Sequence, residues 1–136
     1  MSFFVLDASL WVARLVPQDE FHETVKAWMA GQRAADMQFV SPSLLLAEVA
    51  GAVSRRTGSV ALARKAVKEL ETLPGLRLVE MNNALLLEAA SLAADLGLRG
   101  ADSVYVATAK RLGVPLVTFD VDQRERAKAQ IAVKGM

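Results

Sequence analysis

The stretch that decides the fold is GADSVYVATAKRLGVPLVTFD, residues 100–120. Its first half has the small and apolar residues of a buried helix, and Gly113 followed by Pro115 predicts where that helix ends. Residues 116–119 form a short apolar run, which predicts a strand, and Asp120 follows directly. A helix that leads through a tight turn into an apolar strand is the repeating unit of an α/β fold.

The same alternation continues through the rest of the chain. Further strands are predicted at 3–6, 38–40, 76–79 and 131–133. Helices are predicted over about 19–31 (capped by Asp19), 42–57 (capped by Ser41, with Pro42 at the first helical position), 59–70 (capped by Ser59), 83–96 and 101–112. Apolar strands separated by helices predict a sheet that is covered on both faces. We therefore expect a single domain over residues 1–136, a three-layer α/β/α sandwich with a mostly parallel five-stranded sheet.

The composition limits the class of protein. The absence of cysteine excludes disulfides and thiolate metal sites, and it fits a reducing cytoplasm. No apolar run is long enough to cross a bilayer, and the start of the chain lacks a basic signal segment. We expect a cytoplasmic protein with no membrane partner. The net charge of +1 does not itself predict nucleic-acid binding, but carboxylates withdrawn into a metal site would leave a more basic surface.

Four of the fifteen acidic residues lack an ordinary explanation. Asp7 and Asp120 each follow an apolar strand, and the carboxyl ends of parallel strands are where ligands bind. Glu48 emerges from a helix face of apolar and small residues, where a carboxylate is costly unless something compensates it. Asp102 begins its helix beside two small residues, so it can approach another element closely. Each alone has a plain alternative: a turn or a helix cap for the aspartates, and a salt bridge to an arginine for Glu48.

Taken together, the four carboxylates predict a metal site. At ~5 Å and an effective dielectric constant of ~20, each pair repels by roughly 3 kcal/mol. Such a cluster must take up protons or bind cations. Oxygen ligands without cysteine or histidine favour Mg²⁺ or Mn²⁺ over zinc. A metal held by carboxylates suits phosphodiester hydrolysis, because it activates water and stabilises the leaving oxygen.

Three further polar residues are candidates to support this site. Ser9 and Thr118 lie two residues from Asp7 and Asp120, and their hydroxyls could hold a metal-bound water or orient a carboxylate. Ser9 could equally cap a helix. Asp122 follows Asp120 by two residues, and it either joins the site or faces solvent.

These pieces resemble the PIN domain, and within it the VapC-like toxins of bacterial and archaeal toxin–antitoxin pairs. The matching segments are residues 5–9, 46–49, 100–109 and 116–120. The resemblance covers nearly the whole chain and implies an α/β/α sandwich with a parallel five-stranded sheet. It also implies Mg²⁺- or Mn²⁺-dependent cleavage of RNA, a homodimer, and a small antitoxin that wraps a hydrophobic groove and can block the acidic site.

The resemblance also implies roles for individual residues. It makes Asp7, Glu48, Asp102 and Asp120 the catalytic, metal-binding quartet, with Ser9 and Thr118 as supporting hydroxyls. Trp11, Trp28 and the helices between residues 43 and 73 are candidates for the antitoxin groove or the dimer contact, although an ordinary core role is an alternative for each.

Three other functions compete with a nuclease. A receiver-like signalling domain would need a phosphoacceptor aspartate at the end of the strand 76–79, where the chain has Glu80-Met81-Asn82. A haloacid-dehalogenase-type phosphatase needs a second aspartate two residues after Asp7, where this chain has Ser9. A non-catalytic PIN-fold interaction module would have no need of four acids.

Overall fold

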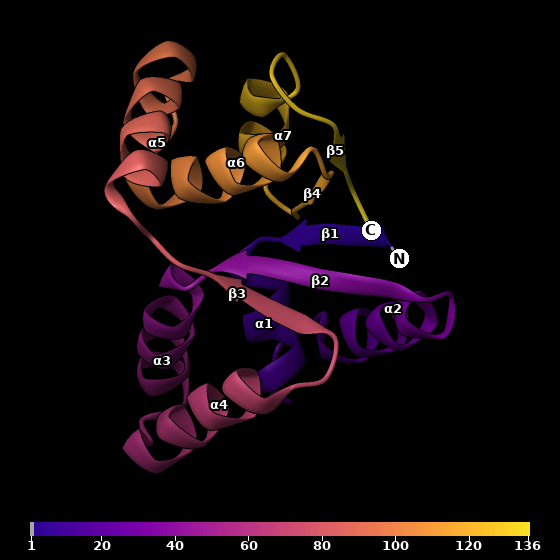
Figure 1. The fold of residues 1–136 in the computed structure, drawn as a ribbon. Helices are drawn as coiled ribbons and strands as arrows, with labels where there is room; N and C mark the ends of the chain where they lie inside the picture. The colour runs from indigo at the N-terminus through magenta and orange to yellow at the C-terminus, as the bar shows by residue number, and fades with distance from the viewer. Residues whose placement is uncertain (1) are drawn as a thin grey trace.

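Apolar strands form the centre of the molecule, and helices cover both faces (Figure 1). The computed structural model describes residues 2–136. The strands are β1 (Ser2–Leu6), β2 (Met37–Pro42), β3 (Leu76–Val79), β4 (Leu116–Val117) and β5 (Val133–Lys134). The helices are α1 (Ala8–Leu15), α2 (His22–Ala34), α3 (Leu44–Thr57), α4 (Val60–Thr72), α5 (Asn83–Leu96), α6 (Gly100–Leu112) and α7 (Val121–Ala127). Figure 1 shows α1–α4 on one face of the sheet and α5–α7 on the other, which confirms the predicted sandwich.

The sheet has five strands in the order β3-β2-β1-β4-β5, and every pair is parallel. Val5 of β1 pairs with Val40 on one side and with Leu116 on the other. The chain therefore winds outward in both directions from β1. In such sheets a crevice forms beyond the carboxyl ends of the strands where the winding reverses, here between β1 and β4. Asp7 follows β1 directly, so the topology places it at this crevice.

Two helix starts differ from the predicted ones. β2 continues through Pro42, which pairs with Val79, and α3 begins only at Leu44. The prediction of Ser41 as a cap was wrong because Pro42 is compatible with the end of a strand as well as with the start of a helix. α2 begins at His22 and not after Asp19, whose carboxylate instead accepts a hydrogen bond from the Phe21 N–H in the preceding turn.

Two short helices were not predicted, and each begins at a candidate site residue. Asp7 is the N-cap of α1 and accepts a hydrogen bond from the Ala8 N–H, while Asp120 is the N-cap of α7 and accepts one from the Gln123 N–H. Ser9 therefore lies inside α1 and does not cap it. β4 is shorter than the predicted strand 116–119, because the chain leaves the sheet after Val117 to reach the start of α7.

The two tryptophans belong to the core. Trp11 is fully buried and packs edge-on against Phe39, with ring centroids 5.8 Å apart. Trp28 is partly buried and stacks with Phe4 and Phe39. Core packing is thus the main role of both side chains. Within residues 2–136, no helix has both the length and the apolar character needed to cross a membrane.

Candidate active site

Asp7 lies at the centre of the candidate site and is only 8% exposed. One carboxylate oxygen, Oδ1, accepts a hydrogen bond from the Ala8 N–H at 2.8 Å. The other, Oδ2, accepts from the hydroxyls of Ser9 at 2.9 Å and Thr118 at 3.0 Å. Burial raises the pKa of Asp7 and the charge of Asp102 adds to this, although the hydrogen bonds oppose both. Ionised Asp7 is therefore held in one orientation, and a nearby cation would reduce the free-energy cost of burying its charge.

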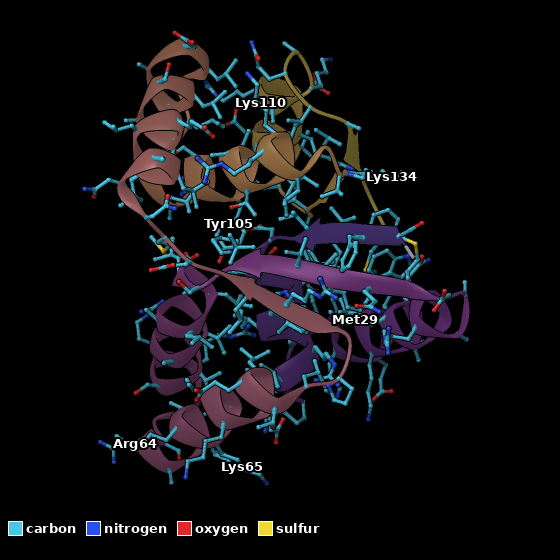
Figure 2. All side chains as sticks on the ribbon, in the orientation of Figure 1. Met29, Arg64, Lys65, Tyr105, Lys110 and Lys134 are labelled. Carbon is cyan, nitrogen blue, oxygen red and sulfur yellow. The ribbon has the colours of Figure 1, made fainter. Side chains whose placement is uncertain are left out.

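Glu48 is held by a tyrosine from another element. The fully buried Tyr105 of α6 donates its hydroxyl hydrogen to Glu48 Oε1 at 2.6 Å. Figure 2 shows Tyr105 between α6 and the end of β2, on the side of the helix that faces the sheet. Burial raises the pKa of Glu48, and so do the charges of Asp7 and Asp102, while the tyrosine hydroxyl lowers it. The hydrogen bond fixes one oxygen of a half-buried carboxylate that its neighbours repel.

This role of Tyr105 was not predicted from the sequence. The available signal was spacing, because Tyr105 follows Asp102 by three residues and so shares its helix face. Burial and the hydrogen bond to Glu48 together raise the pKa of Tyr105, so it remains a hydrogen-bond donor at neutral pH.

Asp102 and Asp120 are joined by one arginine. Arg99 donates from Nε to Asp102 Oδ2 at 3.2 Å and from Nη2 to Asp120 Oδ2 at 3.3 Å. Its side chain is 80% exposed, and the two carboxylates keep the pKa of its guanidinium above the ordinary value, Asp102 most strongly. The other oxygen of Asp120 accepts from the Gln123 N–H at 3.1 Å, which caps α7. A salt bridge to an arginine was the alternative role expected for Glu48, whereas the structure places an arginine on Asp102 and Asp120.

Thr118 connects the two halves of the site. Its Oγ1 accepts the Asp120 N–H and lies 3.0 Å from both Asp7 Oδ2 and the Oε1 of the fully buried Gln123. One hydroxyl proton cannot serve both oxygens, and Gln123 Nε2 is buried without a partner among the described residues. With the Gln123 amide turned over, Nε2 donates to Thr118 and the Thr118 hydroxyl is free to donate to Asp7, which removes the conflict at Thr118. Gln123 thereby supports Asp7 through Thr118, a role not apparent from the sequence.

The other two candidates for supporting roles differ in position. Ser9 contacts Asp7, as its spacing predicts. Asp122 is 73% exposed and pairs with Arg126, one helical turn away, at 2.9 Å. Asp122 therefore faces solvent and does not join the carboxylates around Asp7.

The structure brings three of the four predicted carboxylates into mutual electrostatic range. Asp102 raises the pKa of both Asp7 and Glu48, and Asp7 raises that of Glu48. Asp120 is turned toward Arg99 and the start of α7. As placed, no three Asp, Glu, His or Cys side chains within residues 2–136 form a group that could hold a metal ion. The donor atoms nevertheless fit Mg²⁺ or Mn²⁺, since they are carboxylate oxygens oriented by hydroxyls, and the cation now beside two of them is Arg99.

Comparisons with known proteins agree with this architecture. The structure resembles that of VapC20 from Mycobacterium tuberculosis, described as a sarcin-ricin loop cleaving toxin, with a TM-score of 0.77 and 22% identity over 91% of this chain and 94% of that one. It also resembles VapBC2 from Rickettsia felis, solved with promoter DNA, with a TM-score of 0.75 and 14% identity over 98% of both chains. FitAcB from Neisseria gonorrhoeae has a TM-score of 0.67 and 24% identity over 96% of this chain and 95% of that one.

Sequence comparison gives the family directly. No curated protein sequence matches the chain. The family model of the PIN domain matches residues 4–129, which is most of the sequence and includes all four candidate carboxylates. The chain therefore belongs to the PIN domain family.

Proposed function

We propose that this protein is a Mg²⁺- or Mn²⁺-dependent endoribonuclease and the toxin of a toxin–antitoxin pair. The observation that carries the proposal is the convergence of Asp7, Glu48 and Asp102, which come from the end of β1, from α3 and from α6. The charge of Asp102 raises the pKa of both Asp7 and Glu48, and the charge of Asp7 raises the pKa of Glu48. A fold that places buried carboxylates side by side gains from a bound cation. The structural neighbour described as a cleaving toxin supports the choice of RNA as substrate.

In this proposal Asp7, Glu48, Asp102 and Asp120 hold the metal. When bound, the ion supplies an activated water for attack on a phosphodiester and stabilises the leaving oxygen. Ser9 and Thr118 keep Asp7 Oδ2 in one orientation, and Tyr105 does the same for Glu48 Oε1. The chain thus orients Asp7 and Glu48 before an ion binds, which would reduce the cost of ordering these two ligands.

Mutation of Asp7 tests the proposal. Asp7→Asn keeps the size of the side chain and its contact with the Ala8 N–H but removes the central charge. We expect RNA cleavage in Mn²⁺ to fall by at least about 100-fold, as measured on a labelled RNA with purified protein. The matched control is Asp36→Asn at an exposed turn, which should cleave like the native protein. Equal cleavage by Asp7→Asn and native protein would refute the catalytic assignment.

The proposed partners are a small antitoxin and a second copy of the chain. Several structural neighbours are toxin–antitoxin complexes, from Rickettsia felis and Klebsiella pneumoniae among others. The exposed Leu86 and Leu87 on α5 are apolar side chains that such an interface would cover. Light scattering of the pure protein should give the mass of a dimer, and coexpression with any short gene encoded beside it should yield a stable complex.

The competing functions are weaker. A receiver-like domain is excluded, because its strand order is 2-1-3-4-5 and the order here is 3-2-1-4-5, with Glu80 after β3 where the phosphoacceptor would lie. A non-catalytic PIN-fold interaction module is the remaining alternative, and the Asp7→Asn experiment distinguishes it, since such a module would show no metal-dependent cleavage to lose.

A further inference from the structure

We propose that Arg99 binds an RNA phosphate. In the metal-free protein its guanidinium is paired with Asp102 and Asp120, and a divalent ion that binds these two carboxylates releases it to contact the RNA. The inference rests on the proposed function, because it assigns a residue to the handling of metal and RNA at that site. It makes Arg99 a positioning and binding residue that the sequence motifs did not indicate.

The first observation is the position of the guanidinium. It contacts two carboxylates through two different nitrogens: Asp102, in the first turn of α6, and Asp120, which follows β4 and lies 21 residues after Arg99 in the sequence. Among the ion pairs of residues 2–136, no other one involves Asp102 or Asp120. Arg99 thus supplies the positive charge that these two predicted ligands require in the metal-free protein.

The second observation is that the Arg99 side chain is largely exposed to solvent. The side chain of Arg99 is 80% exposed, and ion pairs in such positions contribute little, because water and salt screen them. A divalent ion that binds Asp102 and Asp120 directly brings twice the charge to the same oxygens. The ion and the guanidinium compete for these oxygens, and the exposed, weakly held guanidinium is the group that leaves.

The third observation is where the released side chain remains. Arg99 is the N-cap residue of α6, so its backbone is fixed one turn from Asp102. The freed guanidinium therefore stays at the edge of the acidic site, where an RNA backbone must approach to be cut. Its planar, two-pronged donors match phosphate oxygens better than an ammonium group does.

Substitution of Arg99 should consequently affect two ligands in opposite directions. Without the competing guanidinium, metal binding should become tighter. Without the phosphate contact, RNA binding should become weaker. A salt bridge that only stabilised the fold would produce neither of these effects in the folded protein.

The experiment compares native protein with Arg99→Gln, Arg99→Lys and a control, Arg111→Gln. Arg111 lies at the other end of the same helix and pairs with Glu88, so its loss removes an equal charge away from the site. Calorimetric titration with Mn²⁺ in the absence of RNA should give about threefold to tenfold tighter binding for Arg99→Gln and no change for Arg111→Gln.

RNA binding is measured by fluorescence anisotropy with a nuclease-resistant oligonucleotide, 2′-O-methylated and phosphorothioate-linked, at saturating Mn²⁺. Arg99→Gln should bind severalfold more weakly, and the slope of log Kd against log salt should fall by about 0.7, the value of one single-strand phosphate contact. Arg99→Lys should keep the slope because it keeps the charge.

Unchanged or weaker Mn²⁺ binding by Arg99→Gln, or an unchanged salt slope, would overturn the proposal for Arg99 while leaving a nuclease that still depends on Asp7. If the native protein binds no Mn²⁺ and cleaves no RNA, the proposed function fails, and the role of Arg99 fails with it.

Discussion

Tyr105 links two helices through a single hydrogen bond to Glu48. Tyr105→Phe removes the donor and leaves a half-buried carboxylate facing an apolar ring. We expect a loss of about 1–3 kcal/mol in the free energy of unfolding, measured in urea without metal. Because Glu48 would lose its orientation, Mn²⁺ affinity should also fall by about tenfold, measured by calorimetric titration.

Thr108→Val is the matched control for this change. Thr108 is a buried residue of the same helix, but its hydroxyl bonds to Val104 O within α6. The control should leave Mn²⁺ affinity unaltered. Equal Mn²⁺ affinities for Tyr105→Phe and native protein would contradict the positioning role of Tyr105.

Thr118 is the second residue on which the geometry of the site depends. Thr118→Val keeps the shape of the side chain but removes one donor to Asp7 and the acceptor for the Asp120 N–H. The unfolding free energy should fall by about 1–3 kcal/mol, because the polar groups left behind are buried. Ser9→Ala removes the other hydroxyl that donates to Asp7 Oδ2. Ser9 is exposed, so water can take the place of its hydroxyl and the loss of unfolding free energy should be smaller. A larger loss for Ser9→Ala than for Thr118→Val would contradict this account.

At the residue scale, the sequence could predict four candidate carboxylates but not all of the side chains that contact them. Asp7 and Asp120 are predictable because strand ends share an edge of the sheet. Tyr105, Gln123 and Arg99 are not, because their roles depend on how side chains from separate elements meet in space. No local pattern in a sequence specifies such a contact.

At the scale of elements, the connection between α1 and α2 is tied to α3 by an ion pair. Asp19 accepts a hydrogen bond from Arg56 Nη1 at 2.6 Å. Burial would raise the pKa of Asp19, but the hydrogen bonds from Arg56 and from the Phe21 N–H outweigh it and hold this pKa below its usual value. The stability that this carboxylate contributes is therefore present above its ordinary pKa of 3.8 and is lost as the pH falls through the lower pKa of the folded state.

Asp19→Asn tests this connection. The variant should be about 0.5–1 kcal/mol less stable than native protein at neutral pH, a modest figure because Arg56 is well exposed to solvent. The difference should close as the pH falls below 3.8. Urea unfolding at a series of pH values measures both. A difference that persists unchanged at low pH would show that the carboxylate charge is not the cause.

The ends of helices were predictable where the residue at the boundary is typical of only one local structure. Ser59 caps α4 by accepting from the Leu62 N–H, and Gly97 and Gly113 end α5 and α6 in the left-handed conformation, as the sequence indicates. Pro42 is compatible with both the end of a strand and the start of a helix, and its pairing with β3 places it in the strand. The short helices α1 and α7 have too few residues for a periodic pattern to indicate them reliably.

At the scale of the whole molecule, the parallel sheet is what brings distant acids together. β1 and β4 lie side by side although more than a hundred residues separate them, so that Thr118 contacts Asp7. This topology was predictable from alternating strands and helices. The pairing of Asp102 and Asp120 with Arg99 was not, because it depends on the charge balance of the assembled site.

The central claim is that a divalent ion stabilises the folded protein through Asp7. The most direct test is the unfolding free energy of native protein and Asp7→Asn as a function of Mn²⁺ concentration. For native protein we predict a rise of about 1.4 kcal/mol at ten times the dissociation constant, and for Asp7→Asn a much smaller one. No rise for native protein up to about 20 mM Mn²⁺, or an equal rise for both proteins, would contradict the claim.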